Sequence, residues 1–264
     1  MTADTPARQQ ISALGWLRIS LRGLSLALAL PLCIALYLIC KPFTAHNPAP
    51  RIFLKAAGFL LGLRVSVQGE PRRRAAFLLS NHVSWLDIPA LGGLTGTAFV
   101  AHDGLAAHSW LRWLCRMNDT VFIARHDRTS IARQVEQVRQ ALHETGLLTV
   151  FAEGTTGPGD KILPFKSSLL SALSPAPQDI LVQPIWLDYW PRPSEIAWLD
   201  GETGKENFLR IAARARPIGL TVHFLPPLAQ DTLTSRKSIA SASHGAIVRQ
   251  MQNTNRQRDQ RVAL

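Results

Sequence analysis

The chain has 264 residues, 47% of them hydrophobic and 18% charged, and a formal net charge of +11. This length suits one catalytic domain with an N-terminal extension, and the positive charge indicates anionic partners other than nucleic acid, because no nucleic-acid-binding module is recognisable. A disulfide framework is excluded and a reducing compartment is favoured, since only three cysteines occur: Cys33, Cys40 and Cys115.

The N-terminal region predicts a membrane-associated helical hairpin over residues 1–63. Residues 23–40 carry no charge and, as a helix, would extend over roughly 27 Å, close to the ~30 Å hydrocarbon core of a bilayer. A second amphipathic stretch, residues 52–63, follows a proline-rich turn. Two such helices can enter one leaflet and return, so we favour a monotopic hairpin. A single membrane span and a helix pair buried in a soluble core are the alternatives.

From residue 64 onward, short β-like runs alternate with helical ones, which predicts an α/β fold with a mixed, largely parallel sheet flanked by helices. The clearest helix covers residues 130–145, with Thr129 or Ser130 as its cap and Gly146 at its end. We expect a catalytic domain over residues 64–230 and a basic C-terminal helix or tail over 231–264. The expected strands are 64–68, 76–80, 98–101, 121–124, 147–152, 180–187 and 220–225.

A histidine and an aspartate, His82 and Asp87, directly follow the expected strand at 76–80. An imidazole beside a carboxylate can take a proton from a hydroxyl near neutral pH. On a straight helix the two side chains would lie about 140° apart, so we expect the chain to bend between them, where a strand gives way to a helix. The alternative is a surface histidine followed by an aspartate that caps a helix.

Three further polar blocks follow expected strands, and ligands of open α/β sheets bind beyond the carboxyl ends of strands. We therefore expect one shared site, in which an arginine could hold an anion and a glycine could allow close backbone approach. Taken singly, each residue would more often be a solvated surface residue. The expected substrate-binding residues come from these three blocks and from the position before His82. They are Asn81, Phe122, Arg125, Glu153, Gly154, Thr155, Lys166 and Pro184.

This ordered set resembles the glycerolipid acyltransferase family, which includes bacterial 1-acylglycerol-3-phosphate acyltransferases, over roughly residues 64–225. The family's NHxxxxD block is matched in full at residues 81–87. The resemblance implies that His82 is the general base and that Asp87 orients its ring. Three positions depart from the family's pattern, because Gly, Pro and Arg are usual where this chain has Asp119, Ala152 and Thr156.

The last departure bears on the acceptor. In the family that arginine is taken to help hold the acceptor's phosphate, and Thr156 offers no charge for a dianion. Either Arg125 and Lys166 carry the phosphate, or the acceptor lacks a phosphate monoester. The runs at residues 152–156 and 164–168 resemble the branch that acylates lyso-ornithine lipid.

The resemblance implies an O-acyltransferase that moves a fatty acyl group from acyl-CoA or acyl-ACP to the free hydroxyl of a lysolipid. We expect 1-acyl-sn-glycerol-3-phosphate as the acceptor, giving phosphatidic acid, with lyso-ornithine lipid as the alternative. The expected partners are membrane lipids and the acyl donor, at the inner (cytoplasmic) membrane with the catalytic domain facing the cytoplasm. No cofactor is expected, and no metal, because the sequence has no HExxH motif or Cys/His cluster.

Two other classes of protein compete with the acyltransferase. A membrane-associated lipid esterase would need a G-x-S-x-G nucleophile elbow, which the sequence lacks. A non-enzymatic membrane adaptor would explain the apolar N-terminal region and the charge, but it leaves the polar blocks beside the strands without a purpose.

Overall fold

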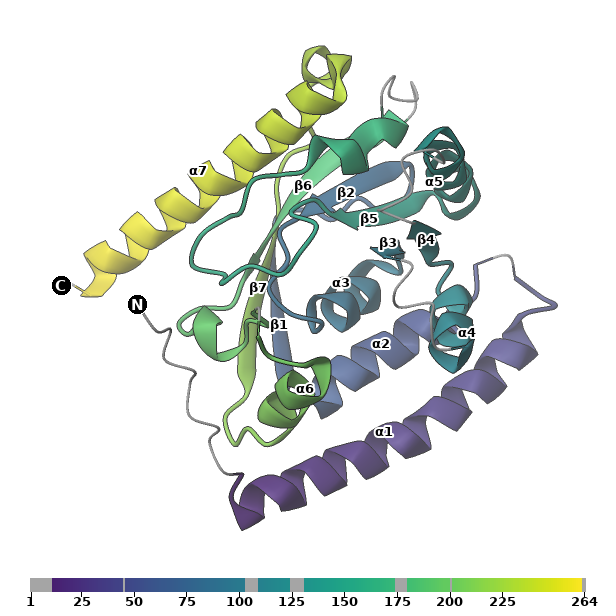
Figure 1. Cartoon of the computed structure of the whole chain (residues 1–264), viewed down its shortest axis with the longest axis vertical. Coiled ribbons are helices and arrows are strands. Elements are labelled where there is room, and N and C mark those ends of the chain that lie inside the picture. The colour runs from purple at the N-terminus through teal and green to yellow at the C-terminus, as the bar shows by residue number, and fades with distance from the viewer. Residues whose placement is uncertain are drawn as a thin grey trace.

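The computed structural model describes residues 11–44, 46–102, 109–123, 131–173, 180–199 and 201–262. Within these residues, seven strands form one sheet in the order β1-β7-β6-β2-β5-β3-β4 (Figure 1). Neighbouring strands are parallel except for β6 and β7, which are antiparallel. The predicted mixed, largely parallel sheet is thus confirmed. The strands are β1 (Leu63–Gln68), β2 (Ala76–Ser80), β3 (Ala98–His102), β4 (Val121–Ile123), β5 (Leu147–Phe151), β6 (Leu181–Asp188) and β7 (Ile218–Phe224).

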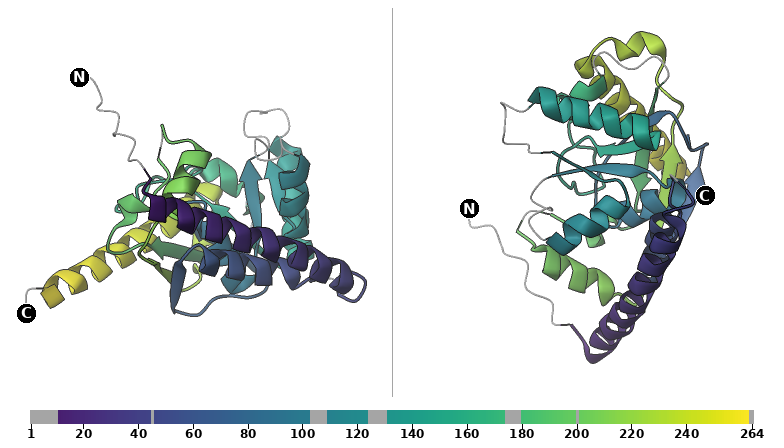
Figure 2. Two further views of the ribbon diagram at one scale, coloured as in Figure 1. Left: turned by 90° about the horizontal axis from the view of Figure 1, so that it is seen from below. Right: turned by 90° about the vertical axis from the view of Figure 1, so that its right-hand side faces the viewer.

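Helices cover both faces of the sheet, as the fully buried central strand β2 requires. Leu78 of β2 packs in one core cluster with Leu91 of α3, whereas Phe77 packs on the other face with Leu142 of α5. Figures 1 and 2 show α3 and α6 on the first side and α5 and α7 on the second. The helices that follow the N-terminal pair are α3 (Asp87–Thr95), α4 (Ser109–Met117), α5 (Ile131–Thr145), α6 (Gly204–Ala212) and α7 (Arg236–Val262), with 3₁₀ helices η3 (Ser167–Leu173), η4 (Pro193–Glu195) and η5 (Gln230–Thr234).

The α5 helix confirms the helix predicted after β4, and it ends just before Gly146. Its expected caps, Thr129 and Ser130, lie outside the described residues. The α7 helix occupies the predicted basic C-terminal segment as far as Val262.

The N-terminal helix α1 (Ala13–Cys40) begins ten residues before the apolar run and packs against α2 (Ala49–Leu60). The Ser12 hydroxyl caps it by accepting a hydrogen bond from the Gly15 N–H (3.2 Å). In the described part of the chain, α1 is the one helix long and apolar enough to cross a membrane. Its outer surface is apolar and exposed, which argues against a helix pair enclosed in a soluble core. Seven leucines of α1 are more than half exposed: Leu14, Leu17, Leu21, Leu24, Leu28, Leu32 and Leu38.

The second helix, α2, joins this N-terminal pair to the sheet by packing closely against α3. A Cβ added at Gly93 of α3 would lie 2.8 Å from the Cα and 2.9 Å from the backbone N of Lys55 in α2. Those are backbone atoms, so they cannot move aside as a flexible side chain would. Contact between α2 and α3 therefore requires glycine at position 93.

Replacing Gly93 with alanine is expected to lower the free energy of unfolding by about 1–3 kcal/mol, because the methyl group would push α2 away from α3. This loss outweighs the gain of up to about 1 kcal/mol that alanine normally brings to a helix. Thermal unfolding in detergent micelles would measure it. The matched control is Gly23→Ala in α1, where an added Cβ meets nothing within 4 Å. A Gly93→Ala protein as stable as the control would contradict this packing argument.

Candidate active site

The candidate site begins where β2 ends, in the turn that leads into α3. Asn81, the first residue of this turn, bridges to β6: its side-chain amide donates to the Leu187 carbonyl (3.2 Å) and accepts from the Leu187 N–H (2.7 Å). The Asn81 side chain is buried and both of its polar ends are occupied. Asn81, expected to contact substrate, therefore fixes the strand end on which the next residue stands.

His82 and Asp87 meet in this turn, with 2.7 Å between Nδ1 of His82 and Oδ2 of Asp87. The same carboxylate oxygen accepts hydrogen bonds from the backbone N–H groups of Val83 (2.7 Å) and Ser84 (3.0 Å). The chain thus bends around Asp87, which is the first residue of α3. The structure thus changes from strand to helix between the two side chains, as expected.

Asp87 is fully buried, and its second oxygen accepts a hydrogen bond from the Tyr189 hydroxyl (2.6 Å). Burial raises the pKa of Tyr189 well above its usual value, and the charge of Asp87 raises it further. Tyr189 therefore keeps its proton and acts as a donor. Because the carboxylate can only accept, the proton between it and His82 belongs on Nδ1, which leaves Nε2 with a free lone pair.

The His82 ring is held on one side by Phe151, the last residue of β5, with ring centroids 4.0 Å apart and planes 13° from parallel. The His82 side chain is 19% exposed. No described residue hydrogen-bonds to Nε2. Nε2 is therefore left without a hydrogen-bond partner among the described residues, on a ring that is partly exposed.

A second buried carboxylate supports the backbone of His82. One oxygen of Glu153 accepts from the His82 N–H (2.8 Å), and the other accepts from the Leu163 N–H (2.7 Å). Burial raises the Glu153 pKa to about 7, although the two backbone hydrogen bonds act in the opposite direction. Glu153 was expected to contact substrate, but with both oxygens occupied and its side chain buried it positions His82 instead.

The loop after Glu153 also holds the turn. The Gly157 N–H donates to the His82 carbonyl (2.6 Å), and the Trp198 N–H donates to the Val83 carbonyl (2.9 Å). The Thr156 hydroxyl donates to the Trp198 carbonyl and so ties these two supports together. At the position where the resembling family has an arginine, this chain thus has a hydroxyl turned toward its own backbone.

The other residues of this third block lie at the surface of the same loop. Gly154 adopts φ +71°, a left-handed conformation that favours glycine, and Thr155 next to it is exposed. The exposed Lys166 is brought back to this loop by a hydrogen bond from its N–H to the Ala152 carbonyl (2.8 Å). These three residues are therefore placed where a ligand could reach them.

The structure does not bring every expected residue to this edge of the sheet. Pro184 lies inside β6 in register with Leu79, and its carbonyl accepts from the Leu225 N–H (3.0 Å). The expectation that this block follows a strand is wrong: the strand continues to Asp188. Phe122 is on β4, the outermost strand of the sheet, which β5 and β3 separate from β2. Arg125 lies outside the described residues.

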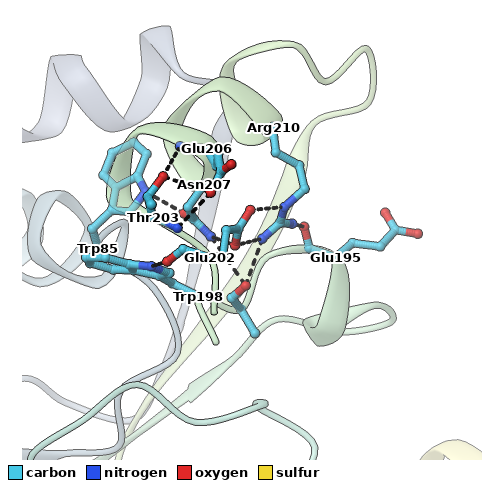
Figure 3. A network of polar contacts seen from close by, with 9 residues as sticks. Trp85, Glu195, Trp198, Glu202, Thr203, Glu206, Asn207 and Arg210 are labelled. Carbon is cyan, nitrogen blue, oxygen red and sulfur yellow. Dashed lines mark hydrogen bonds and ion pairs between the residues drawn. The ribbon is translucent and has the colours of Figure 1, made fainter. Parts of the chain in front are cut away.

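A polar network fixes the segment that supplies Trp198 (Figure 3). The Trp85 indole N–H, from the turn between His82 and Asp87, donates to the Asn207 side chain of α6 (2.8 Å). Asn207 and Arg210 both donate to the Glu202 carboxylate, at 2.7 and 2.8 Å. The bond from Arg210 is the main reason that the Glu202 pKa is lowered. The network thus connects α6 to the turn that carries His82 and Asp87.

An apolar groove of about 410 Å³ lies beside this turn, between α1, α2, α3 and α6. Trp85 contributes one wall, so the groove borders the segment that carries His82 and Asp87. Side chains that line the apolar groove include Leu26, Leu30, Phe53, Trp85, Ile88 and Phe208.

The described residues include no cluster of three or more His, Cys, Asp or Glu side chains that could hold a metal ion.

Replacing Glu153 with glutamine is expected to remove a pH dependence of folding. The Glu153 pKa is about 7 in the folded chain against a usual 4.5, so the folded state binds this proton more tightly than the unfolded state does. Its contribution to stability is fully present below pH 4.5 and is lost, by about 3 kcal/mol in total, as the pH rises through about 7.

Thermal unfolding in detergent micelles at several pH values would measure this effect as a difference in Tm between wild type and Glu153→Gln that falls across that range. Glu136→Gln, at an exposed position on α5, is the matched control and should follow the wild type. A difference between wild type and Glu153→Gln that stays constant with pH would contradict the prediction.

Comparison with known proteins places this geometry in a family. Residues 64–188 match the family model described as Acyltransferase. The chain is 32% identical over 248 residues to a lyso-ornithine lipid O-acyltransferase of Rhodobacter capsulatus, a match that covers 87% of this chain and 88% of that protein. It is 30% identical over 125 residues to a 1-acyl-sn-glycerol-3-phosphate acyltransferase of Neisseria gonorrhoeae, covering 46% of this chain and 48% of that protein.

The fold is also shared with a solved structure. The crystal structure of the 1-acyl-sn-glycerophosphate acyltransferase from Thermotoga maritima matches with a TM-score of 0.60 at 21% identity, over 90% of this chain and 98% of that one. The family match covers the strands and the turn that carry His82 and Asp87. The chain therefore belongs to the lysolipid acyltransferase family and is an acyltransferase.

Proposed function

We propose that this enzyme transfers a fatty acyl group from acyl-CoA or acyl-ACP to the free hydroxyl of a lysolipid, with His82 as the general base and Asp87 as its positioning residue. The observation that carries this proposal is the 2.7 Å contact between His82 Nδ1 and the buried Asp87 carboxylate, which leaves Nε2 of a partly exposed ring available to a hydroxyl. The neighbouring apolar groove supports a lipid substrate rather than a polar one.

In the proposed reaction, Nε2 of His82 removes the proton of the lysolipid hydroxyl while that oxygen attacks the thioester carbonyl of the donor. Asp87 stabilises the imidazolium that forms. The tetrahedral intermediate then collapses, the C–S bond breaks, and the imidazolium returns its proton to the departing thiolate. General-base catalysis of this kind contributes about 10²–10⁴-fold, so positioning of the two substrates must supply the rest.

Direct transfer fits the site better than an acyl-enzyme does. The serines nearest to His82 along the chain, Ser80 and Ser84, are both fully buried. The Ser84 hydroxyl oxygen lies within the turn, where it accepts a hydrogen bond from the Leu86 N–H (3.4 Å). Neither hydroxyl is placed to meet a thioester, which disfavours the esterase alternative with a serine nucleophile.

We propose lyso-ornithine lipid as the acceptor, which changes the preference drawn from the sequence. Two proteins that carry this name match the chain at 32% identity over 87% and 83% of its length. The orientation of Thr156 supports the same acceptor, because its hydroxyl is bound to the Trp198 carbonyl and brings no charge to a phosphate monoester. The second candidate is 1-acyl-sn-glycerol-3-phosphate, which the shorter match to the Neisseria protein favours.

We further propose that the enzyme works at the inner membrane with its catalytic domain on the cytoplasmic side. The exposed leucines of α1 support attachment to a bilayer. The packing of α1 against α2, which itself packs on α3, supports a hairpin that stays on one side of the membrane over a helix that crosses it alone. Three free cysteines fit a reducing compartment.

One assay tests the function and the acceptor together. The purified enzyme in detergent is incubated with labelled acyl-CoA or acyl-ACP and, in parallel, with lyso-ornithine lipid and with 1-acyl-sn-glycerol-3-phosphate. We expect a diacyl product, with the larger kcat/KM for lyso-ornithine lipid, and a loss of at least about 100-fold in His82→Ala. His143→Ala, at an exposed position on α5, is the matched control and should remain active.

Each other outcome of this assay contradicts a stated part of the proposal. Release of free fatty acid without a diacyl product would indicate the esterase, and no turnover with any acceptor would indicate the adaptor. Near-normal turnover by His82→Ala would show that His82 is not the general base. A larger kcat/KM for 1-acyl-sn-glycerol-3-phosphate would overturn lyso-ornithine lipid as the proposed acceptor.

Replacing Tyr189 with phenylalanine is expected to lower kcat by about tenfold while KM changes little, because Asp87 would lose a hydrogen bond to its charged group. The lost bond acts on His82 only through Asp87, so the pH–rate profile should shift as well as fall. Steady-state kinetics at several pH values would measure both effects. An unchanged kcat, or a loss confined to KM, would show that Tyr189 does not position the pair.

A further inference from the structure

Four arginines gather where the N-terminal part of α1 meets the body of the enzyme. Arg18 and Arg22 stand one turn apart on α1, Arg64 is on β1, and Arg214 follows α6. Arg18, Arg64 and Arg214 all lie near enough to Arg22 for their charges to act on it. Arg22 lies directly over the backbone that leads into β1, since a Cβ at Gly62 would be 3.1 Å from its Nη2.

The charge of this arginine cluster (Arg18, Arg22, Arg64 and Arg214) is largely uncompensated. Arg214 pairs with Glu195 (2.9 Å), but no carboxylate in the described part of the chain pairs with the other three. The nearest hydrogen-bond partners of Arg22 are carbonyls at the end of α6, among them that of Ala212 (2.9 Å). In addition, Nε of Arg214 is buried without a hydrogen-bond partner among the described residues.

The cluster continues into the apolar groove along one face of α1. Leu26 and Leu30, which line the groove, follow Arg22 at intervals of four residues and so share its face of the helix. On the outer surface of the same helix end, Trp16 is half exposed, as is typical at the level of lipid headgroups. The arginine cluster thus stands beside an exposed tryptophan at one end of α1, and the apolar groove follows it along the helix.

We propose that the arginine cluster binds the headgroup of an anionic phospholipid of the membrane, whose acyl chain runs along α1 into the apolar groove. Guanidinium groups suit phosphate oxygens because their N–H donors form a planar fork. A lipid is favoured over a soluble anion because the positive cluster adjoins an entirely apolar channel on an exposed, leucine-rich helix. The acyl-chain part of this site shares the apolar groove with the lipid substrate of the proposed function, but the headgroup part does not, so binding of anionic lipid can be tested without an activity assay.

Vesicle flotation tests the proposal with two variants that lose the same charge. Wild type should bind vesicles of equal parts phosphatidylglycerol and phosphatidylcholine more tightly than vesicles of phosphatidylcholine alone. Arg22→Gln/Arg64→Gln should weaken binding to the anionic vesicles at least about tenfold, since each arginine contributes roughly fivefold. Arg73→Gln/Arg74→Gln, in the exposed loop before β2, is the matched control and should keep the wild-type preference for the anionic vesicles.

A second variant separates a structural role of the arginines from their role in lipid binding. Arg22 bonds to the end of α6, so its loss could disturb folding, which thermal unfolding would reveal. Arg64→Gln alone leaves those bonds in place, since Arg64 donates only to the Phe59 and Leu63 carbonyls. This variant should still bind the anionic vesicles about fivefold more weakly than wild type.

Three results would overturn the site: equal binding of wild type to both kinds of vesicle, an equal loss in the control variant, or displacement from anionic vesicles by millimolar glycerol phosphate. The last result would identify a soluble anion as the ligand. None of these measurements depends on acyl transfer, so the lipid site and the proposed function can fail independently.

Discussion

The site depends on one buried carboxylate that accepts four hydrogen bonds. Asp87 receives donors from His82, from the backbone of Val83 and Ser84, and from the Tyr189 hydroxyl. A charge in the interior is tolerated only when such donors replace the water it has lost. The donors come from the turn after β2 and from the end of β6, and the carboxylate itself is on the first residue of α3. The demands of a single group therefore hold three elements at one edge of the sheet.

The surrounding contacts extend the same constraint to the backbone. His82 is held at its N–H by Glu153 and at its carbonyl by Gly157, while Phe151 supports its ring. A ring fixed in this way has little freedom left to lose, which is the condition that the proposed general base would need. Glu153 acts on His82 through the backbone, so under that proposal a carboxylate beside the base need not touch the acceptor.

The sequence predicted the strands well because their residues are buried in runs bounded by turn signals, as in β2 and β5, where every residue is buried. It predicted that a helix begins between His82 and Asp87 but not how far α3 extends, since Pro89 and two glycines are poor helix formers. The packing of α3 on α2 explains the glycines, because an added Cβ at Gly93 would meet the Lys55 backbone. His82 and Asp87 were found from their spacing. Tyr189 was missed because its role depends on the order of strands, which places the end of β6 beside the end of β2.

The same reasoning explains why Pro184 was misplaced and why α1 is longer than its apolar run. A proline in a central strand removes one ladder hydrogen bond. In β6 the Leu225 carbonyl beside Pro184 accepts from the Gln183 side-chain amide (2.9 Å), so it is not left without a donor. On α1, the residues before the apolar run include two arginines that bond to the end of α6. An uncharged helix would bind the body through apolar contacts alone and could slide along it. Arginines bonded to fixed carbonyls set the register of α1, and with it the position of the apolar groove that α1 helps to line.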